Sequence, residues 1–191
     1  LFVLSELNFK KNGFFVEFGA TNGLAGSNTF LLENNFDWNG ILAEPAKQWH
    51  AELSKNRHVF IEKDCVWRAS NETLIFNEIG GLSTIDNFSN SDQHSLARTK
   101  GHKYKVNTIS LIDLLDKYDA PPVIDYLSID TEGSEYEILN AFDFDQYEIK
   151  IITCEHNYSD NREKIYNLLT NRGYTRRYKE YSDVDDWYVR H

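Results

Sequence analysis

Short apolar runs typical of β-strands alternate along this chain with stretches of helical periodicity. The strand-like runs are residues 14–18, 41–43, 59–61, 73–76, 124–129, 149–154, 174–178 and 186–190. The helical stretches are residues 29–34, 46–56, 110–118, 134–141 and 160–171, the last closed by Gly173. Ser110 with Asp113, and Ser134 with Glu137, have capping-box spacing, which predicts a helix cap at each serine. Alternation of this kind predicts an open α/β sheet with helices on both faces. In such sheets, ligands bind outside the carboxyl ends of the parallel strands.

The length and the remaining segments indicate one domain. A chain of 191 residues has a single-domain length. We therefore expect a single domain over 1–191, with 1–13 as an N-terminal helix or lead-in. Residues 83–101 are polar and aperiodic, which predicts a loop or lid.

Carboxylates follow the strand-like runs. Five successive runs end in, or within a few residues of, an acid: Glu17, Glu44, Asp64, Asp130 and Glu155. Acids also favour helix N-termini because of the helix dipole, and for any single residue that explanation is at least as good. For five acids on one edge, with a glycine turn at Gly19 and Gly23 among them, a binding site is the better explanation.

The glycine turn and the acids restrict the ligand. The chain lacks both G-x-G-x-x-G and G-x-x-x-x-G-K-S/T, the glycine patterns that cradle phosphates. Its net charge is −10 and it has no dense basic cluster, which argues against a nucleic-acid partner. Acids suit a cationic ligand rich in hydroxyls and amines, such as S-adenosylmethionine. Glu44 is placed to accept both ribose hydroxyls, although an NAD enzyme would put an acid in a similar position.

The cysteines and the hydropathy pattern bear on the compartment. Cys65 and Cys154 lie 89 residues apart, each beside an apolar run. We interpret them as free thiols, which favours a reducing compartment and a cytoplasmic location. No apolar run approaches the roughly 18 residues that a membrane span needs, so we expect no membrane span.

Six sequence blocks resemble the FkbM family of S-adenosylmethionine-dependent methyltransferases. In chain order they are FVEFGATNGLAGSNTFLLE, GILAEP, GGLSTI, TISLIDLLD, IDYLSIDTEGSEYEIL and ITCEHN. The resemblance implies a Rossmann-like class I methyltransferase fold with a seven-stranded, mostly parallel sheet whose last strand is antiparallel. It also implies O-methylation of a hydroxyl, often on a sugar or glycan and sometimes on a polyketide-like product.

The resemblance also assigns roles to residues. Glu17, Gly19, Ala20 and Asn22, with Gly23, would wrap the methionine end of the donor. Glu44 would take the ribose hydroxyls, Asp64 and Cys65 would hold adenine, and Asp130 would stand beside the methyl group. Ser83 would line the cleft near the acceptor. Thr21 departs from commoner methyltransferases, which often have a second glycine there, so the turn geometry is less certain at that position.

A hydroxyl acceptor must lose its proton, and three residues could help. His156 is the best base on general grounds because imidazole titrates near neutrality, though a strand-end histidine can equally be bonded to a backbone carbonyl. Asp130, Glu155 and His156 could instead hold a divalent ion, Mg²⁺ or Mn²⁺. We expect Glu132 to accept loop or helix N–H groups and to fix the Asp130 turn, rather than to take part in catalysis.

Two other functions fit parts of the pattern. The chain could be a non-catalytic descendant of the fold, working as a binding or trafficking module, although its candidate donor-site residues are intact. An NAD-type oxidoreductase is disfavoured because the triple-glycine fingerprint is missing.

Overall fold

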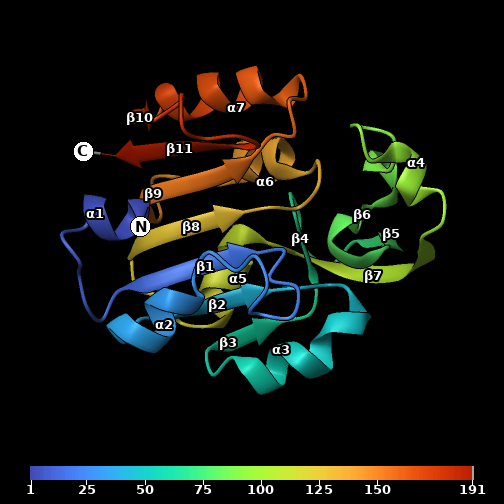
Figure 1. Cartoon of the computed structure of the whole chain (residues 1–191), viewed down its shortest axis with the longest axis horizontal. Helices are drawn as coiled ribbons and strands as arrows, with labels where there is room; N and C mark the ends of the chain where they lie inside the picture. The colour runs from blue at the N-terminus through green and yellow to red at the C-terminus, as the bar shows by residue number, and fades with distance from the viewer. Residues whose placement is uncertain (191) are drawn as a thin grey trace.

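The computed structural model describes residues 1–190 of the chain. A seven-stranded sheet forms the centre of the molecule. The strand order is β10-β11-β9-β8-β1-β2-β3 (Figure 1). The strands are β1 (Phe14–Phe18), β2 (Asn39–Ala43), β3 (Phe60–Glu62), β8 (Val123–Ile129), β9 (Glu148–Glu155), β10 (Tyr174–Arg177) and β11 (Asp185–Arg190). Pairing is parallel from β3 through β1 to β9, whereas β11 is antiparallel to both of its neighbours. The predicted fold class is confirmed; the predicted domain end at residue 191 lies outside the described residues.

The chain reverses direction across the sheet between β1 and β8. From β1 it proceeds outward through β2 and β3, and it later returns to pair β8 against the other side of β1. The register sets Phe18, at the end of β1, beside Ala43 on β2 and Ile129 on β8. Such a switch point leaves a crevice at the carboxyl ends of the strands, where open α/β sheets bind ligands.

Helices cover both faces of this sheet. Leu114, Leu139 and Ile165 belong to one core cluster, which α5 (Leu111–Lys117), α6 (Glu135–Ala141) and α7 (Asn161–Thr170) press against the strands. Leu4, Leu32 and Leu53 belong to the cluster on the opposite face, from α1 (Phe2–Glu6), α2 (Phe30–Phe36) and α3 (His50–Asn56). None of the helices between residues 1 and 190 is long and apolar enough to cross a bilayer.

One of the two predicted helix caps forms. Ser110 Oγ accepts the Asp113 N–H at 3.1 Å, as the capping-box spacing predicts. The equivalent prediction for Ser134 was wrong, because its hydroxyl instead donates to Thr131 Oγ1 at 2.8 Å and makes no cap bond. At the end of α7, Gly173 adopts a left-handed φ of +87°, which is the conformation expected of a helix-terminating glycine.

A second, four-stranded sheet packs beside the carboxyl end of the first and was not predicted. Its order is β4-β7-β5-β6, formed by β4 (Cys65–Trp67), β5 (Thr73–Glu78), β6 (Thr84–Ile85) and β7 (His102–Ser110) (Figure 1). Short 3-10 turns at Lys47–Trp49, Gly80–Leu82 and Asp86–Phe88 and the helix α4 (Ser95–Arg98) complete the described elements. The prediction of a loop or lid over 83–101 was therefore wrong at β6 and α4, which are too short to show a period.

Candidate active site

A cleft lies where the carboxyl ends of β1, β2 and β8 meet the second sheet. Its empty space is about 580 Å³, a figure that includes the open solvent at its mouth. Its lining residues are Phe18, Gly19, Thr21, Ala43, Glu44, Pro45, Cys65, Val66, Phe76, Gly80, Gly81, Ser83, Ile85, Asp130, Thr131, Glu132 and Ser134. Within residues 1–190, this lining contains acids but no lysine or arginine.

Gly19 turns the chain at the end of β1. Its φ is +75°, and a Cβ on it would lie 2.0 Å from the carbonyl oxygen of Asp130. Glycine is therefore required both for the left-handed backbone and for the close approach of β1 to the end of β8. Two residues later Thr21, also left-handed at φ +47°, donates its N–H to Glu44 Oε2 at 2.7 Å.

Glu44 is buried at the floor of the cleft, just after β2. Its Oε2 accepts from Thr21 N–H, and its Oε1 accepts from Ala46 N–H at 2.8 Å. Desolvation by burial, with the charges of Asp130 and Glu78, raises the pKa of Glu44 to about 7 despite these bonds. Each carboxylate oxygen has a second lone pair, so two ligand hydroxyls can still be accepted.

One wall of the cleft is apolar. Cys65, Val66, Phe76 and Ile85 line it from the second sheet. Burial, assisted by the nearby charges of Glu44 and Asp64, raises the pKa of the Cys65 thiol to about 12, so the thiol stays neutral. Cys65 and Cys154 are both free and buried, as the sequence predicted. A flat aromatic base would pack well against this wall.

Three carboxyl groups cluster at the opposite wall. Oxygens of Asp130, Glu132 and Glu155 lie within 4.8 Å of one another. Desolvation raises the pKa of Asp130, although this residue is exposed at the cleft, and that of the buried Glu155; the two groups hydrogen-bond to each other, which requires a proton between them. Burial and the neighbouring Asp130 also raise the pKa of Glu132, to about 8. Near neutral pH the cluster therefore holds protons that it can exchange.

Glu132 connects this cluster to the end of helix α4. Its Oε2 accepts from Arg98 Nη2 at 2.6 Å and from Asn157 Nδ2 at 3.2 Å. Arg98 is fully buried and also binds Asp92 through both guanidinium ends, at 2.8 and 3.0 Å. The expectation that Glu132 fixes the Asp130 turn was wrong.

Glu135, the first residue of α6, fixes the turn after Asp130 instead. Its Oε1 accepts the N–H groups of Thr131 and Gly133, at 3.0 and 2.9 Å. Both acids stand in the same short block of sequence. Spacing alone could not tell them apart, because the choice depends on the left-handed φ of +59° at Glu132 itself.

His156 does not join the carboxyl cluster. Its Nδ1 accepts the Tyr158 N–H at 3.0 Å, and its Nε2 lies 3.8 Å from Asp186 Oδ1 without a hydrogen-bond partner in the described chain. Burial, with the charge of Arg162, lowers the pKa of His156, which favours the neutral ring. The group within reach of one ion contains Glu132 where the sequence suggested His156.

Glu17 points into the protein rather than into the cleft. Its Oε1 accepts the Asn28 N–H at 2.8 Å, and its Oε2 accepts hydroxyls of Ser27 and Thr29 at 2.9 and 2.5 Å. These bonds hold the loop that follows the Gly19 turn. Burial raises the pKa of Glu17.

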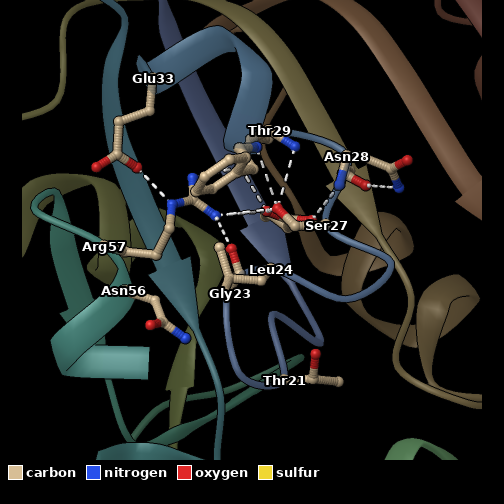
Figure 2. A network of polar contacts seen from close by, with 12 residues as sticks. Thr21, Gly23, Leu24, Ser27, Asn28, Thr29, Glu33, Asn56 and Arg57 are labelled. Atoms are coloured by element: carbon tan, nitrogen blue, oxygen red, sulfur yellow. Dashed lines mark hydrogen bonds and ion pairs between the residues drawn. The ribbon is translucent and has the colours of Figure 1, made fainter. Parts of the chain in front are cut away.

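Arg57, which the sequence reasoning missed, holds the same loop from the end of α3. Figure 2 shows its guanidinium between the loop and α2, bonded to Glu33 Oε2 at 2.5 Å and to Gly23 O at 3.2 Å. It also donates to the hydroxyls of Ser27 and Thr29, at 2.9 and 2.8 Å. A Cβ on Gly23 would lie 2.5 Å from Arg57 Cγ, so this glycine makes room for the arginine.

The other predicted donor residues support the turn or lie beside it. Ala20 is in the core, and Asn22 Oδ1 accepts the N–H groups of Leu24 and Ala25, both at 3.0 Å. Asp64 does not line the cleft, because β3 already ends at Glu62, whose carboxylate bonds the turn and Lys117. Of the predicted site residues, the cleft brings together Gly19, Glu44, Cys65, Ser83 and Asp130.

Comparison with protein families decides what kind of site this is. Residues 17–181 match the model of the methyltransferase FkbM domain. The chain belongs to the FkbM methyltransferase family. Membership in this family supports methyl transfer as the activity and S-adenosylmethionine as the donor, and it confirms the resemblance seen in the sequence blocks.

One solved structure supports the fold of this FkbM methyltransferase, and a second gives a weaker match. The precorrin-6y C5,15-methyltransferase of Geobacter metallireducens is 12% identical with a TM-score of 0.51, covering 98% of this chain and 84% of that one. The ribosomal protein L11 methylase of Lactobacillus delbrueckii is 8% identical with a TM-score of 0.49, covering 100% and 76%. At such identities the first likeness shows the fold alone. None of the curated proteins compared with the chain matches it.

Proposed function

We propose that this methyltransferase transfers the methyl group of S-adenosylmethionine to a hydroxyl of a sugar, glycan or similar polyhydroxylated acceptor. The observation that carries the donor assignment is the cleft lining, which has a buried Glu44 and, in the described chain, no basic side chain. Such a lining attracts a cation with hydroxyls and repels phosphate. The acceptor assignment rests on the family resemblance and on the carboxyl cluster beside the cleft.

Each part of the cleft matches one part of the donor. Glu44 has free lone pairs for the two ribose hydroxyls, and Cys65 with its apolar neighbours offers a wall for adenine. The Gly19 turn would receive the methionine end, with Asp130 beside the methyl group. The turn itself would be shaped by four residues that do not line the cleft, Glu17, Ala20, Asn22 and Gly23. Asp64, which also lies outside the cleft lining, would not contact the donor directly.

The carboxyl cluster would supply the base. Bound in the cleft, the donor offers an electrophilic methyl carbon on a sulfonium. The acceptor oxygen would attack that carbon as the C–S bond breaks with its electron pair going to sulfur, and the hydroxyl proton would pass to Asp130 or Glu155. A carboxyl pair with raised pKa exchanges a proton near neutral pH, which general-base catalysis requires. His156, the third candidate base, has both ring nitrogens directed at other groups.

A divalent ion bound by the carboxyl cluster is the second part of the proposal, beside the methyl donor. Asp130, Glu132 and Glu155 offer oxygens within 4.8 Å of one another, which fits the oxygen ligands that Mg²⁺ or Mn²⁺ prefers. The ion would lower the pKa of an acceptor hydroxyl. Thermal melts with MgCl₂ and with EDTA test the site: we expect Mg²⁺ to raise the melting temperature of the wild type but not of Asp130→Asn. Equal melting temperatures of the wild type in MgCl₂ and in EDTA would refute the metal site and leave the carboxyl groups as a cluster that shares protons.

Calorimetry with S-adenosylhomocysteine tests the donor site. We expect Glu44→Ala to weaken binding at least tenfold, about 1.4 kcal/mol, because the ribose loses its acceptor. Glu163→Ala, at an exposed position on α7, is the matched control and should bind like the wild type. An unchanged dissociation constant in Glu44→Ala would refute the ribose assignment, and no binding to the wild type at millimolar ligand would favour the binding or trafficking module.

A further inference from the structure

A second cavity lies on the face of the large sheet, beneath α1 and α2. Its volume is about 600 Å³ including its mouth, and it shares no lining residue with the donor cleft. Its polar lining comes from Asn28, Tyr126, Thr153, Asp185 and Trp187. Leu31, a half-exposed residue of α2, lies at its rim. The proposed function above assigns no ligand to this cavity.

Strand register places the cavity beside the carboxyl cluster. Asp185 on β11 pairs directly with Glu155 on β9, and Trp187 pairs with Thr153. Residues two apart on a strand face the same side, about 7 Å from each other. The cavity therefore begins one side-chain step from Glu155. After burial and Glu135, the charge of Asp185 contributes to the raised pKa of Asp130, consistent with this proximity.

The floor of the cavity is a row of hydroxyls and one amide. Tyr126 OH and Thr153 Oγ1 lie 2.7 Å apart, and Thr153 donates to Ser128 Oγ at 3.4 Å. Asn28 Nδ2 donates to the same Ser128 oxygen at 3.0 Å. Asn28 also donates its N–H to Glu17, so the row continues into the loop that follows the Gly19 turn. Tyr126, Ser128 and Thr153 are buried and already bonded to one another, so they form a polar floor, while the lining from Leu1 to Leu4 and at Leu31 and Leu32 is apolar.

Two polar groups in the lining have no partner in the described part of the chain. None of its hydrogen bonds or ion pairs reaches the carboxylate of Asp185, whereas the adjacent Asp186 binds Arg162 and Arg176. The indole N–H of Trp187 is likewise unbonded, although its ring stacks on Phe2 with centroids 4.9 Å apart. Both residues are partly exposed and neither atom is fully buried, so both polar groups are open to a ligand that enters the cavity.

We propose that this cavity is the acceptor subsite and binds a neutral, hydroxyl-rich ring such as a pyranose. The inference rests on the proposed methyl transfer and names where its acceptor sits. The indole offers an apolar surface for one face of the ring and an N–H donor at its edge. Asp185 accepts from ring hydroxyls, and its charge disfavours an anionic ligand. A hydroxyl at the near end of the ring would lie next to Asp130 and Glu155.

The four indole N–H signals of the protein make a direct binding test. The probes are glucose, galactose, mannose and N-acetylglucosamine, each titrated at millimolar concentration into the ¹⁵N-labelled protein with S-adenosylhomocysteine present. We expect at least one sugar to shift the Trp187 indole signal saturably, while Trp38, Trp49 and Trp67, which do not line the cavity, stay unmoved. Trp187→Phe assigns the signal.

Two variants and a control sharpen the test. Asp185→Asn should weaken the sugar about tenfold, because a hydrogen bond to a charge is lost. Asp183→Asn, an acid that lies on the same turn and lines neither cavity, should leave it unchanged. Leu31→Trp fills the rim from an exposed helix position and should abolish the shift.

The two proposals fail differently. If S-adenosylhomocysteine binds but none of the four sugars moves the Trp187 signal, the acceptor subsite is refuted while the donor site stands. A shift that survives in both Asp185→Asn and Leu31→Trp also refutes it. If S-adenosylhomocysteine itself does not bind, the proposed function falls.

Discussion

Two residues of one turn, Gly19 and Thr21, are both left-handed but have different surroundings. At Gly19 the missing Cβ makes room for the Asp130 carbonyl, so the fold needs glycine twice over. At Thr21 the side chain donates to Ala25 O at 3.3 Å near the surface, and the N–H to Glu44 would be kept by any residue. The sequence resemblance marks Thr21 as a position where commoner methyltransferases have glycine. In the structure, threonine adopts the left-handed conformation there and still donates its N–H to Glu44.

Replacing Gly19 by alanine should damage both stability and donor binding. A Cβ 2.0 Å from a carbonyl oxygen forces β1 and β8 apart, and the left-handed φ adds strain, together at least about 2 kcal/mol. Urea denaturation and calorimetry with S-adenosylhomocysteine measure the two effects. Full stability in Gly19→Ala would show that the ends of β1 and β8 do not approach as described.

Replacing Thr21 by glycine should instead stabilise the protein slightly. Relief of the left-handed conformation contributes about 1–2 kcal/mol, and the greater backbone entropy of glycine costs about 0.5–1 kcal/mol. The net gain of about 0.5 kcal/mol corresponds to a rise of about 1–2 °C in melting temperature for a chain of this size. A fall in melting temperature would mean that the Thr21 hydroxyl contributes more than its exposed bond suggests.

Among the elements, the loop from Gly23 to Thr29 depends on a side chain from elsewhere. Figure 2 shows Arg57 reaching the loop from the far end of α3, and the Arg57 side chain is fully buried. Because Glu17 and Glu33 both lie against it, removing the guanidinium leaves two buried carboxylates without their cation. The loop then loses its anchor as well as its charge balance.

Arg57→Met should therefore lower the free energy of unfolding by about 3–5 kcal/mol. Arg68→Met is the control, since its ion pair with Glu137 is 3.7 Å long and on the surface, and it should cost no more than about 1 kcal/mol. Chemical denaturation of both variants measures the difference. Similar losses in the two would argue that the network of Figure 2 does not hold the loop.

Local sequence predicted the strands of the large sheet, but of the small sheet it predicted only β5, as the strand-like run 73–76. Strands such as β8 are mostly apolar and buried along nearly their whole length, and an acid such as Asp130 directly follows the strand in the sequence. β7 is nine residues of mixed polarity that pair with β4 on one side and β5 on the other. Its existence depends on partners 24 to 43 residues earlier in the chain, which periodicity does not detect.

The same limit applied to the site. Glu44 was predictable because it ends a strand, and its burial agrees with that position. The partner of Glu17, however, is an arginine 40 positions along the chain, and Glu132 meets Arg98 at the end of α4, a helix inside the stretch predicted as a loop. Tertiary pairing therefore decided which acids face the cleft and which face the interior.

At the scale of the whole molecule, buried acids govern the dependence of stability on pH. The folded state raises the pKa of Glu44 from 4.5 to about 7 and that of Glu132 from 4.5 to about 8, and it raises those of Glu17, Asp130 and Glu155 as well. At pH values between the ordinary pKa of each acid and its raised pKa in the folded state, the folded chain binds more protons than the unfolded chain. Stability must then fall as pH rises.

The ligand-free protein should thus melt at a lower temperature at about pH 8.5 than at about pH 5.5. Glu44→Gln should reduce this slope, because one group that must ionise is removed. Acids with lowered pKa, such as Asp125 and Asp186, act in the opposite direction only below about pH 4 and do not disturb this window. A melting temperature that rises from about pH 5.5 to about pH 8.5 would contradict the assigned burial of these acids.

The charge of the cleft is the central claim, and one comparison of ligands tests it most directly. Calorimetry at a single salt concentration should compare S-adenosylmethionine and S-adenosylhomocysteine with NAD⁺ and ATP, which share the adenosine but add phosphates. We predict that the first pair binds and that the second pair does not, since the described lining offers acids and no basic side chain. Binding of NAD⁺ or ATP as tight as that of S-adenosylhomocysteine would contradict the account.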